Sequence, residues 1–143
     1  MKKINIMLNE YAQSHQNRTN QIIHKICVPL IMLSILGLMW SIPSGEFNIA
    51  IIFSVVALAY YAFLSLKYCL LMIPQLIVMM LMLAWLDRVG VLLETSIVVF
   101  ILSWILQIWG HKIEGKKPSF LKDVFFLLIG PLWVTKAVLN LED

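Results

Sequence analysis

Long apolar runs are the feature that most constrains what this chain can fold into. Four of them approach the ~20 residues that a helix needs to cross the hydrocarbon core of a bilayer. They lie near residues 22–42, 47–66, 68–86 and 91–109. A soluble domain of 143 residues cannot bury a chain that is 61% hydrophobic, because a small domain leaves much of its surface exposed. The sequence therefore predicts an all-α fold, a multi-pass helical bundle within a membrane.

Two shorter segments flank these four runs. In residues 1–20 apolar side chains recur at i, i+3, i+4 and i+7, which predicts an amphipathic helix at the membrane surface or against the bundle. These side chains are Ile4, Met7, Leu8 and Tyr11. A fifth run near residues 124–138 contains Gly130-Pro131 and Lys136, so it either crosses, re-enters or packs obliquely. No repeat or compositional boundary divides the chain, and we expect one integral membrane domain over residues 1–143.

Basic residues near the ends of the runs predict the orientation of the chain. If the N-terminus is cytoplasmic, nine basic residues lie on that side and only Arg88 on the other. The nine are Lys2, Lys3, Arg18, Lys25, Lys67, Lys112, Lys116, Lys117 and Lys122. Because cytoplasmic loops are enriched in Lys and Arg, we predict that orientation. Four crossings then return the chain to its starting side. No basic block with interleaved aromatic residues indicates a nucleic-acid partner, and membrane lipids are the expected surroundings.

All three histidines fall in segments predicted to face the same compartment. His15 and His24 precede the first run, and His111 follows the fourth, three residues before Glu114. A turn at Asn17–Asn20 would let the first two imidazoles converge, whereas one unbroken helix would place them on opposite faces. His111 and Glu114 share a helix face. We therefore predict a metal centre at the mouth of the bundle, although imidazole and carboxylate ligands suit Fe, Zn, Cu or Mn alike.

Other polar side chains near the histidines are candidates for supporting roles. Metal-bound imidazoles usually have a hydrogen-bond partner that orients them. The candidates for such partners are Tyr11, four residues before His15, Gln107, four before His111, and Asn17 and Asn20, with Asn5 or Asn9 nearby. Candidates to bind an acidic headgroup or a substrate carboxylate are Arg18, Lys112 and Lys116.

Two motifs around the histidines resemble those of the Mpo-like family. The first runs from Tyr11 to Pro29 and contains His15, Asn17, Asn20 and His24; the second runs from Trp104 to Pro118 and contains Gln107, Gly110, His111 and Glu114, with Gly130-Pro131 following. The motifs lie at opposite ends, so the resemblance covers essentially the whole chain. Fungal members of the family act in phytosphingosine breakdown as Fe(II)-dependent 2-hydroxy fatty acid dioxygenases.

The resemblance implies a small multi-pass enzyme that binds Fe(II) through histidines. With dioxygen it would remove one carbon from a long-chain 2-hydroxy fatty acid, the reaction called fatty acid alpha-oxidation. Carried over position by position, it implies that His15, His24 and His111 are the metal ligands and that Glu114 is a further catalytic residue. Three protein ligands leave open positions on iron for dioxygen and for a chelating 2-hydroxy carboxylate.

The chain departs from the family pattern in two places. Arg18 stands where a proline is common, and Asp87-Arg88 lacks the histidine that fungal members have there. Two other functions stay open at this point. A bis-histidine haem protein needs only two facing histidines, and a non-enzymatic lipid-binding membrane protein needs none, since histidine at a membrane interface is often merely an amphipathic residue.

Overall fold

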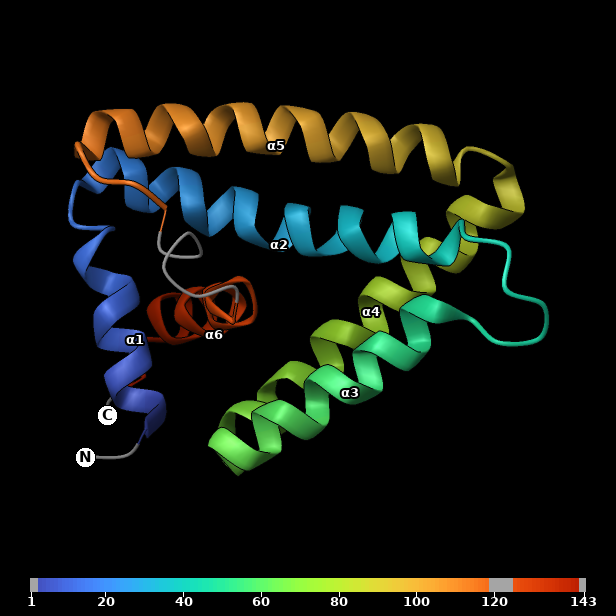
Figure 1. The fold of residues 1–143 in the computed structure, drawn as a ribbon, viewed down its shortest axis with the longest axis horizontal. Coiled ribbons are helices and arrows are strands. Elements are labelled where there is room, and N and C mark those ends of the chain that lie inside the picture. Colours follow the sequence, from blue (N-terminus) through green and yellow to red (C-terminus); the bar gives the residue numbers. More distant parts are fainter. Residues whose placement is uncertain (1–2, 119–124, 142–143) are drawn as a thin grey trace. The chain divides into compact units, whose positions relative to one another are not determined.

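The computed structural model describes residues 3–118 and 125–141, which form six α-helices and no strand. The helices are α1 (Lys3–Gln13), α2 (Arg18–Trp40), α3 (Ile49–Leu64), α4 (Leu66–Val89), α5 (Leu92–Glu114) and α6 (Phe126–Leu139) (Figure 1). The predicted all-α fold is confirmed. Lys2, Lys122 and the start of the fifth apolar run near residue 124 lie outside the described residues. The chain forms two compact units, residues 1–30 with 102–143 and residues 31–101, and α2 and α5 each contribute to both.

Three of the described helices, α2, α4 and α5, are long and apolar enough to cross a membrane. The apolar helices α3 and α6 are shorter, at 16 and 14 residues. At ~1.5 Å per residue, 16 residues span only about 24 Å, less than the ~30 Å of a typical hydrocarbon core. A count of four crossings therefore stays a prediction. Outward apolar side chains such as Val55 and Phe63, 62% and 80% exposed, suit lipid as the surrounding medium.

The helices α2 and α5 begin or end at other residues than the predicted runs, because capping residues set their ends. The second helix, α2, begins at Arg18 rather than near residue 22, because the Asn17 side chain accepts hydrogen bonds from the N–H groups of Thr19 (2.9 Å) and Asn20 (3.4 Å). The turn predicted at Asn17–Asn20 therefore lies earlier, before Arg18. At the other end of the chain, α5 runs past Trp109 to Glu114 and stops at Gly115, which adopts a left-handed φ of 77°.

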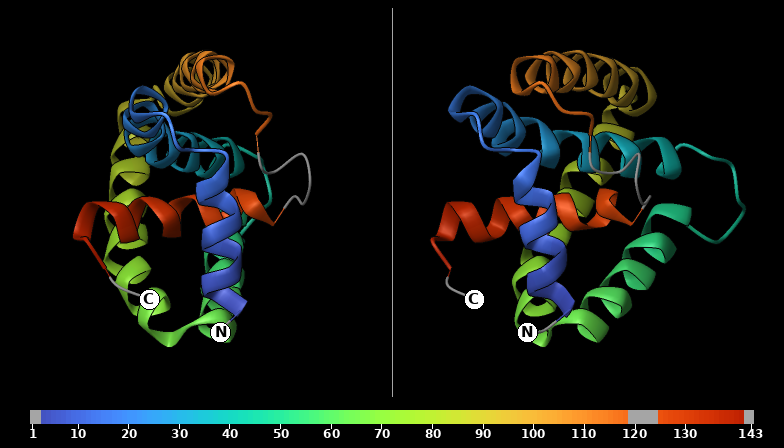
Figure 2. Two further views of the ribbon diagram at one scale, coloured as in Figure 1. Left: turned by 90° about the vertical axis from the view of Figure 1, so that its left-hand side faces the viewer. Right: turned by 60° about the vertical axis from the view of Figure 1, so that its left-hand side comes forward.

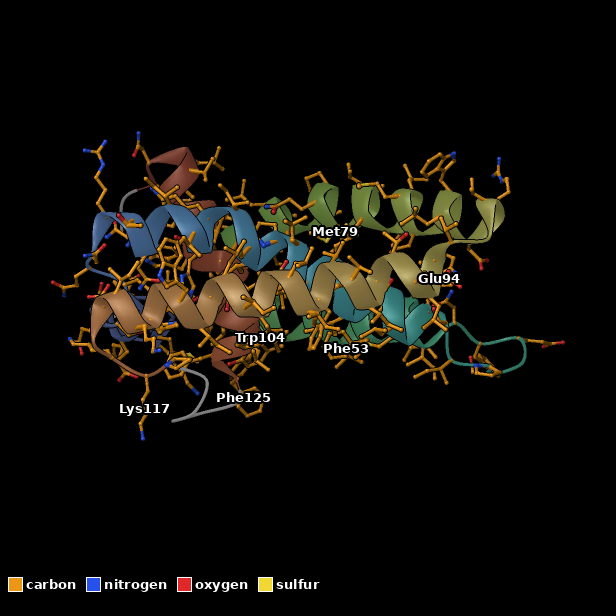
Figure 3. All side chains as sticks on the ribbon, turned by 90° about the horizontal axis from the view of Figure 1, so that it is seen from above. Phe53, Met79, Glu94, Trp104, Lys117 and Phe125 are labelled. Atoms are coloured by element: carbon orange, nitrogen blue, oxygen red, sulfur yellow. The ribbon has the colours of Figure 1, made fainter. Side chains whose placement is uncertain are left out.

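The unit of residues 31–101 contains the antiparallel pair α3 and α4 (Figure 2). Asn48 caps α3 by accepting from the N–H groups of Ala50 and Ile51. The last residue of α4, Val89, lies three residues beyond the predicted end at 86, and Gly90 then ends the helix with a φ of 88°. The core of the pair includes Tyr61 and Met72, both fully buried. Figure 3 shows the side chains on these helices, among them Phe53 on α3 and Met79 on α4.

The unit of residues 1–30 and 102–143 pairs α1 with α6, which lie side by side in Figures 1 and 2. All four residues of the predicted apolar stripe on α1 are buried: Ile4, Met7, Leu8 and Tyr11. From α6, Ile129 and Leu132 are fully buried. A Cβ atom at Gly130 would lie 3.1 Å from the Tyr11 hydroxyl, so glycine here permits close packing of α6 against α1. This unit carries all three histidines.

Candidate metal centre

The three histidines converge at one point of this unit. His15 lies in the connection between α1 and α2, His24 in the second turn of α2 and His111 in the last turn of α5. One nitrogen from each ring lies within 4.8 Å of the other two. The ring centroids are 4.2 Å (15 to 24), 4.9 Å (15 to 111) and 4.6 Å (24 to 111) apart, and each pair meets edge to face. All three side chains are buried, at 1%, 1% and 6% exposed.

Backbone carbonyls fix the tautomers of two of these rings. The Nδ1 atom of His15 lies 2.7 Å from the Tyr11 carbonyl oxygen, and the Nδ1 atom of His24 lies 3.0 Å from the Asn20 carbonyl oxygen. A carbonyl only accepts, so both Nδ1 atoms carry the proton and donate it. A neutral imidazole then presents Nε2 as a bare lone pair. Metal-ligating histidines typically donate their other ring N–H in this way.

Two ring nitrogens of the cluster have no hydrogen-bond partner among the described residues. They are the Nε2 atom of His15 and the Nδ1 atom of His111, both fully buried. An unpaired buried polar group costs about 1–3 kcal/mol, so two in one cluster need a reason. A metal ion about 2.0–2.1 Å from each nitrogen would satisfy both at once. The donor set therefore fits a metal ion.

The electrostatic setting keeps the imidazole of His15 neutral. Burial lowers the pKa of His15 from 6.5 to about 4, although its hydrogen bond to the Tyr11 carbonyl opposes the shift. At neutral pH the His15 lone pair is therefore available to a cation. Burial also raises the pKa of the Tyr11 phenol well above its ordinary value of 10.0, so that group stays neutral beside the cluster.

Aromatic rings form one wall of the cluster. The Tyr11 ring stacks on His15 with centroids 4.2 Å apart and planes 8° from parallel. The Trp133 ring lies 5.2 Å from His15 and 5.4 Å from Tyr11. Sequence reasoning did not identify Trp133, because its place depends on how α6 packs against α1. The wall keeps water from this side of His15 and restricts its ring orientation.

Glu114 lies at the edge of the cluster, and its carboxylate accepts hydrogen bonds from the connection between α1 and α2. Its Oε1 atom accepts hydrogen bonds from the N–H groups of Gln16 (2.8 Å) and Asn17 (2.7 Å), and from the Asn20 side-chain amide (3.1 Å). Among the described residues, the group that could hold a metal comprises the three histidines without Glu114. The structure thus gives Glu114 partners on the α1–α2 connection.

The remaining predicted residues occupy varied positions around the centre. Gln107 is buried one turn before His111, but no hydrogen bond joins the two side chains within the described part of the chain. The Lys116 ammonium donates to the Gln13 carbonyl (2.9 Å), whereas Arg18 and Lys112 are exposed. Lys117, just beyond α5, extends away from the ribbon (Figure 3). A carboxylate-binding role for Arg18, Lys112 or Lys116 stays a prediction.

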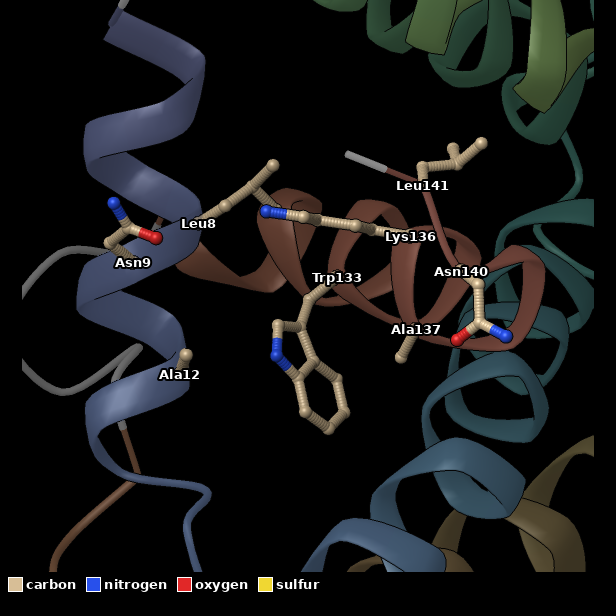
Figure 4. A pocket seen from close by; sticks show the side chains of 8 residues that line it. All are labelled: Leu8, Asn9, Ala12, Trp133, Lys136, Ala137, Asn140 and Leu141. Carbon is tan, nitrogen blue, oxygen red and sulfur yellow. The ribbon is translucent and has the colours of Figure 1, made fainter. Parts of the chain in front are cut away.

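A pocket of about 370 Å³ lies between α1 and α6 next to the centre (Figure 4). It is lined by Leu8, Asn9 and Ala12 of α1, by Trp133, Lys136 and Ala137 of α6, and by Asn140 and Leu141, which follow α6. Trp133 belongs both to this pocket and to the aromatic wall beside His15. In Figure 4 the Lys136 side chain extends across the pocket toward α1. Asn9, one of the polar residues predicted to lie near the histidines, thus lines this pocket.

Comparison with known proteins identifies the family. The model of the Mpo1-like family, described as 2-hydroxy-palmitic acid dioxygenase Mpo1-like, matches residues 1–141 of the 143. No curated protein and no solved structure matches the chain. The match includes both histidine motifs and all six described helices, so the resemblance found in the sequence is confirmed. The chain belongs to the Mpo1-like family.

Proposed function

We propose that this protein is an Fe(II)-dependent dioxygenase that shortens long-chain 2-hydroxy fatty acids by one carbon. The observation that carries the proposal is the convergence of three buried histidines, two with unpaired ring nitrogens, in a member of a family described as 2-hydroxy-palmitic acid dioxygenase. His15, His24 and His111 would hold the iron. When bound, Fe(II) supplies the activation of dioxygen and leaves open positions for the substrate's hydroxyl and carboxylate oxygens.

The packing of the rings favours a single ion over a haem. Every pair of histidine rings meets edge to face, with centroids no more than 4.9 Å apart. No two of these rings leave room between them for a flat macrocycle. Three imidazoles around a shared point are instead the arrangement that one small cation needs.

The protein's own groups set the site before substrate arrives. The carbonyl oxygens of Tyr11 and Asn20 hold the His15 and His24 rings in the tautomer that offers Nε2. Tyr11 and Trp133 cover one side of His15, so water reaches the centre only from elsewhere. The exposed cations of Arg18 and Lys112 would attract the substrate's carboxylate, while its alkyl chain lies along the apolar helices.

The overall reaction balances with dioxygen as the only co-substrate. One 2-hydroxy acid and one dioxygen give the acid one carbon shorter, carbon dioxide and water. The bond between C1 and C2 breaks, C2 is oxidised from an alcohol to a carboxylic acid, and C1 leaves as carbon dioxide. The electrons from both carbons reduce dioxygen fully, so the reaction requires no external reductant.

The proposed setting is a membrane, with the metal centre at its cytoplasmic face. The lengths and apolar compositions of α2, α4 and α5 support membrane placement. The excess of Lys and Arg near the histidine segments supports a cytoplasmic face for the site. A fatty acid in a membrane keeps its acid group at this interface and its chain among lipids, so both parts of the substrate meet suitable surroundings.

A substrate pair tests the proposed reaction. Purified protein with Fe(II) and oxygen should convert a long-chain 2-hydroxy fatty acid to the acid one carbon shorter. The matching acid without the hydroxyl should react ~10⁴–10⁵-fold more slowly, because a site that uses a substrate hydroxyl rejects the analogue lacking it. Product length is measured by mass spectrometry of the extracted acids. Equal turnover of both acids would overturn the role given to the 2-hydroxyl.

A further inference from the structure

The carboxylate of Glu114 joins the end of α5 to the connection between α1 and α2. Its two backbone partners, Gln16 and Asn17, directly follow His15 in that connection, with donor–acceptor distances of 2.8 and 2.7 Å. Hydrogen bonds from N–H groups to a carboxylate are about twice as strong as those between neutral groups. The negative charge also lies at the N-terminus of α2, where the helix dipole favours it. Glu114 therefore fixes the chain one residue from a proposed metal ligand.

Asn20 joins the Glu114 carboxylate to Ser14, at the start of the connection, and to His24 on α2. Its side chain is fully buried, and its Nδ2 atom donates to Glu114 (3.1 Å) and to the Ser14 carbonyl (3.3 Å). The Asn20 carbonyl, in turn, accepts from the Nδ1 atom of His24 (3.0 Å). One residue thus ties the start of the connection to the carboxylate and orients a second histidine.

Lys116 holds the other side of His15. Its Nζ atom donates to the carbonyl of Gln13, the last residue of α1 (2.9 Å). A cation at a helix C-terminus is favoured by the helix dipole, as an anion is at an N-terminus. Glu114 and Lys116 are two residues apart, so the segment after His111 contacts the chain both before and after His15.

Gly110 permits the close approach that these contacts need. A Cβ atom at this position would lie 2.4 Å from the Oδ1 atom of Asn20, closer than atoms can pack. The glycine directly precedes His111. Any side chain here would push Asn20 away from α5, and with it the chain that holds His24.

We propose that Glu114 is a positioning residue rather than a metal ligand. With Asn20 and Lys116 it forms a clamp that holds residues 13–17 against the end of α5, so that His15, His24 and His111 are pre-arranged for a metal ion. A pre-arranged site loses less conformational freedom on binding, so the clamp raises metal affinity. The proposal rests on the metal centre proposed above and states that Glu114, Asn20 and Lys116 hold its ligands in place.

Cobalt(II) binding to the full-length protein in detergent tests the clamp. Replacing Glu114 by Ala should raise the Kd for Co²⁺ ~10–100-fold, the usual effect of losing a group that orients metal ligands. Glu114→Gln keeps an oxygen that accepts from Gln16 and Asn17, so it should recover most of the affinity. Glu94→Gln, on the same helix and exposed, is the matched control and should bind like the wild type. The d–d absorption of the Co²⁺-saturated Glu114→Ala protein should match that of the wild type.

Two outcomes would overturn the positioning role. A changed d–d spectrum at saturation would make Glu114 a ligand, and wild-type affinity in Glu114→Ala would show that the clamp does not support the site. Gly110→Ala offers an independent test should Glu114→Ala not fold. Its loss of Co²⁺ affinity should shrink in an Asn20→Ala background, because the clashing amide is then absent. Equal losses in both backgrounds would contradict the close contact.

A metal-free measurement separates this proposal from the proposed function. In the apo protein, amide hydrogen exchange at Gln16 and Asn17 should be at least 10-fold faster in Glu114→Ala than in the wild type. Unchanged exchange would overturn the clamp whatever the metal result. A wild-type protein that binds no Co²⁺ but shows this change in exchange would instead contradict the metal centre and leave the clamp as a purely structural contact.

Discussion

Replacing Tyr11 separates what its backbone, its ring and its hydroxyl do for His15. The backbone carbonyl fixes the tautomer of His15, and the ring stacks on the imidazole at 4.2 Å. Tyr11→Phe keeps both the carbonyl and the ring. We therefore expect it to change neither the Kd for Co²⁺ by more than about 3-fold nor the free energy of unfolding by more than about 1 kcal/mol, the usual net value of one hydrogen bond.

Tyr11→Ala should behave very differently. The side chain is only 6% exposed, and removing a buried aromatic ring costs about 3–5 kcal/mol. Stacking of aromatic rings contributes about 0.5–1.5 kcal/mol of such a cost. The backbone carbonyl still accepts from His15 Nδ1, but the ring loses the stack that restricts its orientation, so the Kd for Co²⁺ should rise by about 10-fold, the equivalent of ~1.4 kcal/mol. Thermal unfolding in detergent and titration against a chelator of known affinity measure the two effects.

One result would refute this reasoning about Tyr11. If Tyr11→Phe weakened Co²⁺ binding as much as Tyr11→Ala, the phenol hydroxyl would be the group that acts on the centre. Tyr60→Phe, in the other unit, serves as the control for the substitution itself and should leave Co²⁺ binding unchanged.

Two further predictions concern the substrate and the membrane. If the exposed Lys112 binds the carboxylate, Lys112→Glu should raise KM for the 2-hydroxy acid at least 10-fold and leave the iron content unchanged. Steady-state kinetics and metal analysis measure the two quantities. An unchanged KM would exclude this role for Lys112. Single cysteines at the exposed positions Gln16 and Lys117 should label from the cytoplasmic side, and one at Glu46 from the opposite side. Labelling of positions 16 and 117 from different sides would contradict the predicted orientation.

The helices and the histidine cluster follow from patterns that the sequence carries locally. Apolar runs and the stripe on residues 4–11 require only the spacing of side chains along one segment. The charge asymmetry predicts that the segments of His15, His24 and His111 face the same compartment, and the structure brings the three side chains together. The helices and the histidine cluster could therefore be predicted from the sequence, because each depends on few residues.

Details of the centre depend on contacts between distant segments, which one sequence does not reveal. Two of the three partners of Glu114 are backbone N–H groups, and every residue except proline has such a group, so the identities of Gln16 and Asn17 did not indicate these contacts. Trp133 reaches His15 only because α6 packs on α1. Gly115 could have indicated that α5 continues past the predicted end at residue 109 to Glu114, because glycine often follows a helix C-terminus.

The iron content of the protein tests the central claim most directly. Protein purified without oxygen and loaded with Fe(II) should hold about one iron per chain, as three imidazole ligands around one point imply. His15→Ala, His24→Ala and His111→Ala should each lose most of this iron, whereas Glu114→Ala should regain it at saturating Fe(II). Circular dichroism confirms that each variant keeps its helices. Full iron occupancy in all three histidine variants would contradict the assignment of the metal centre.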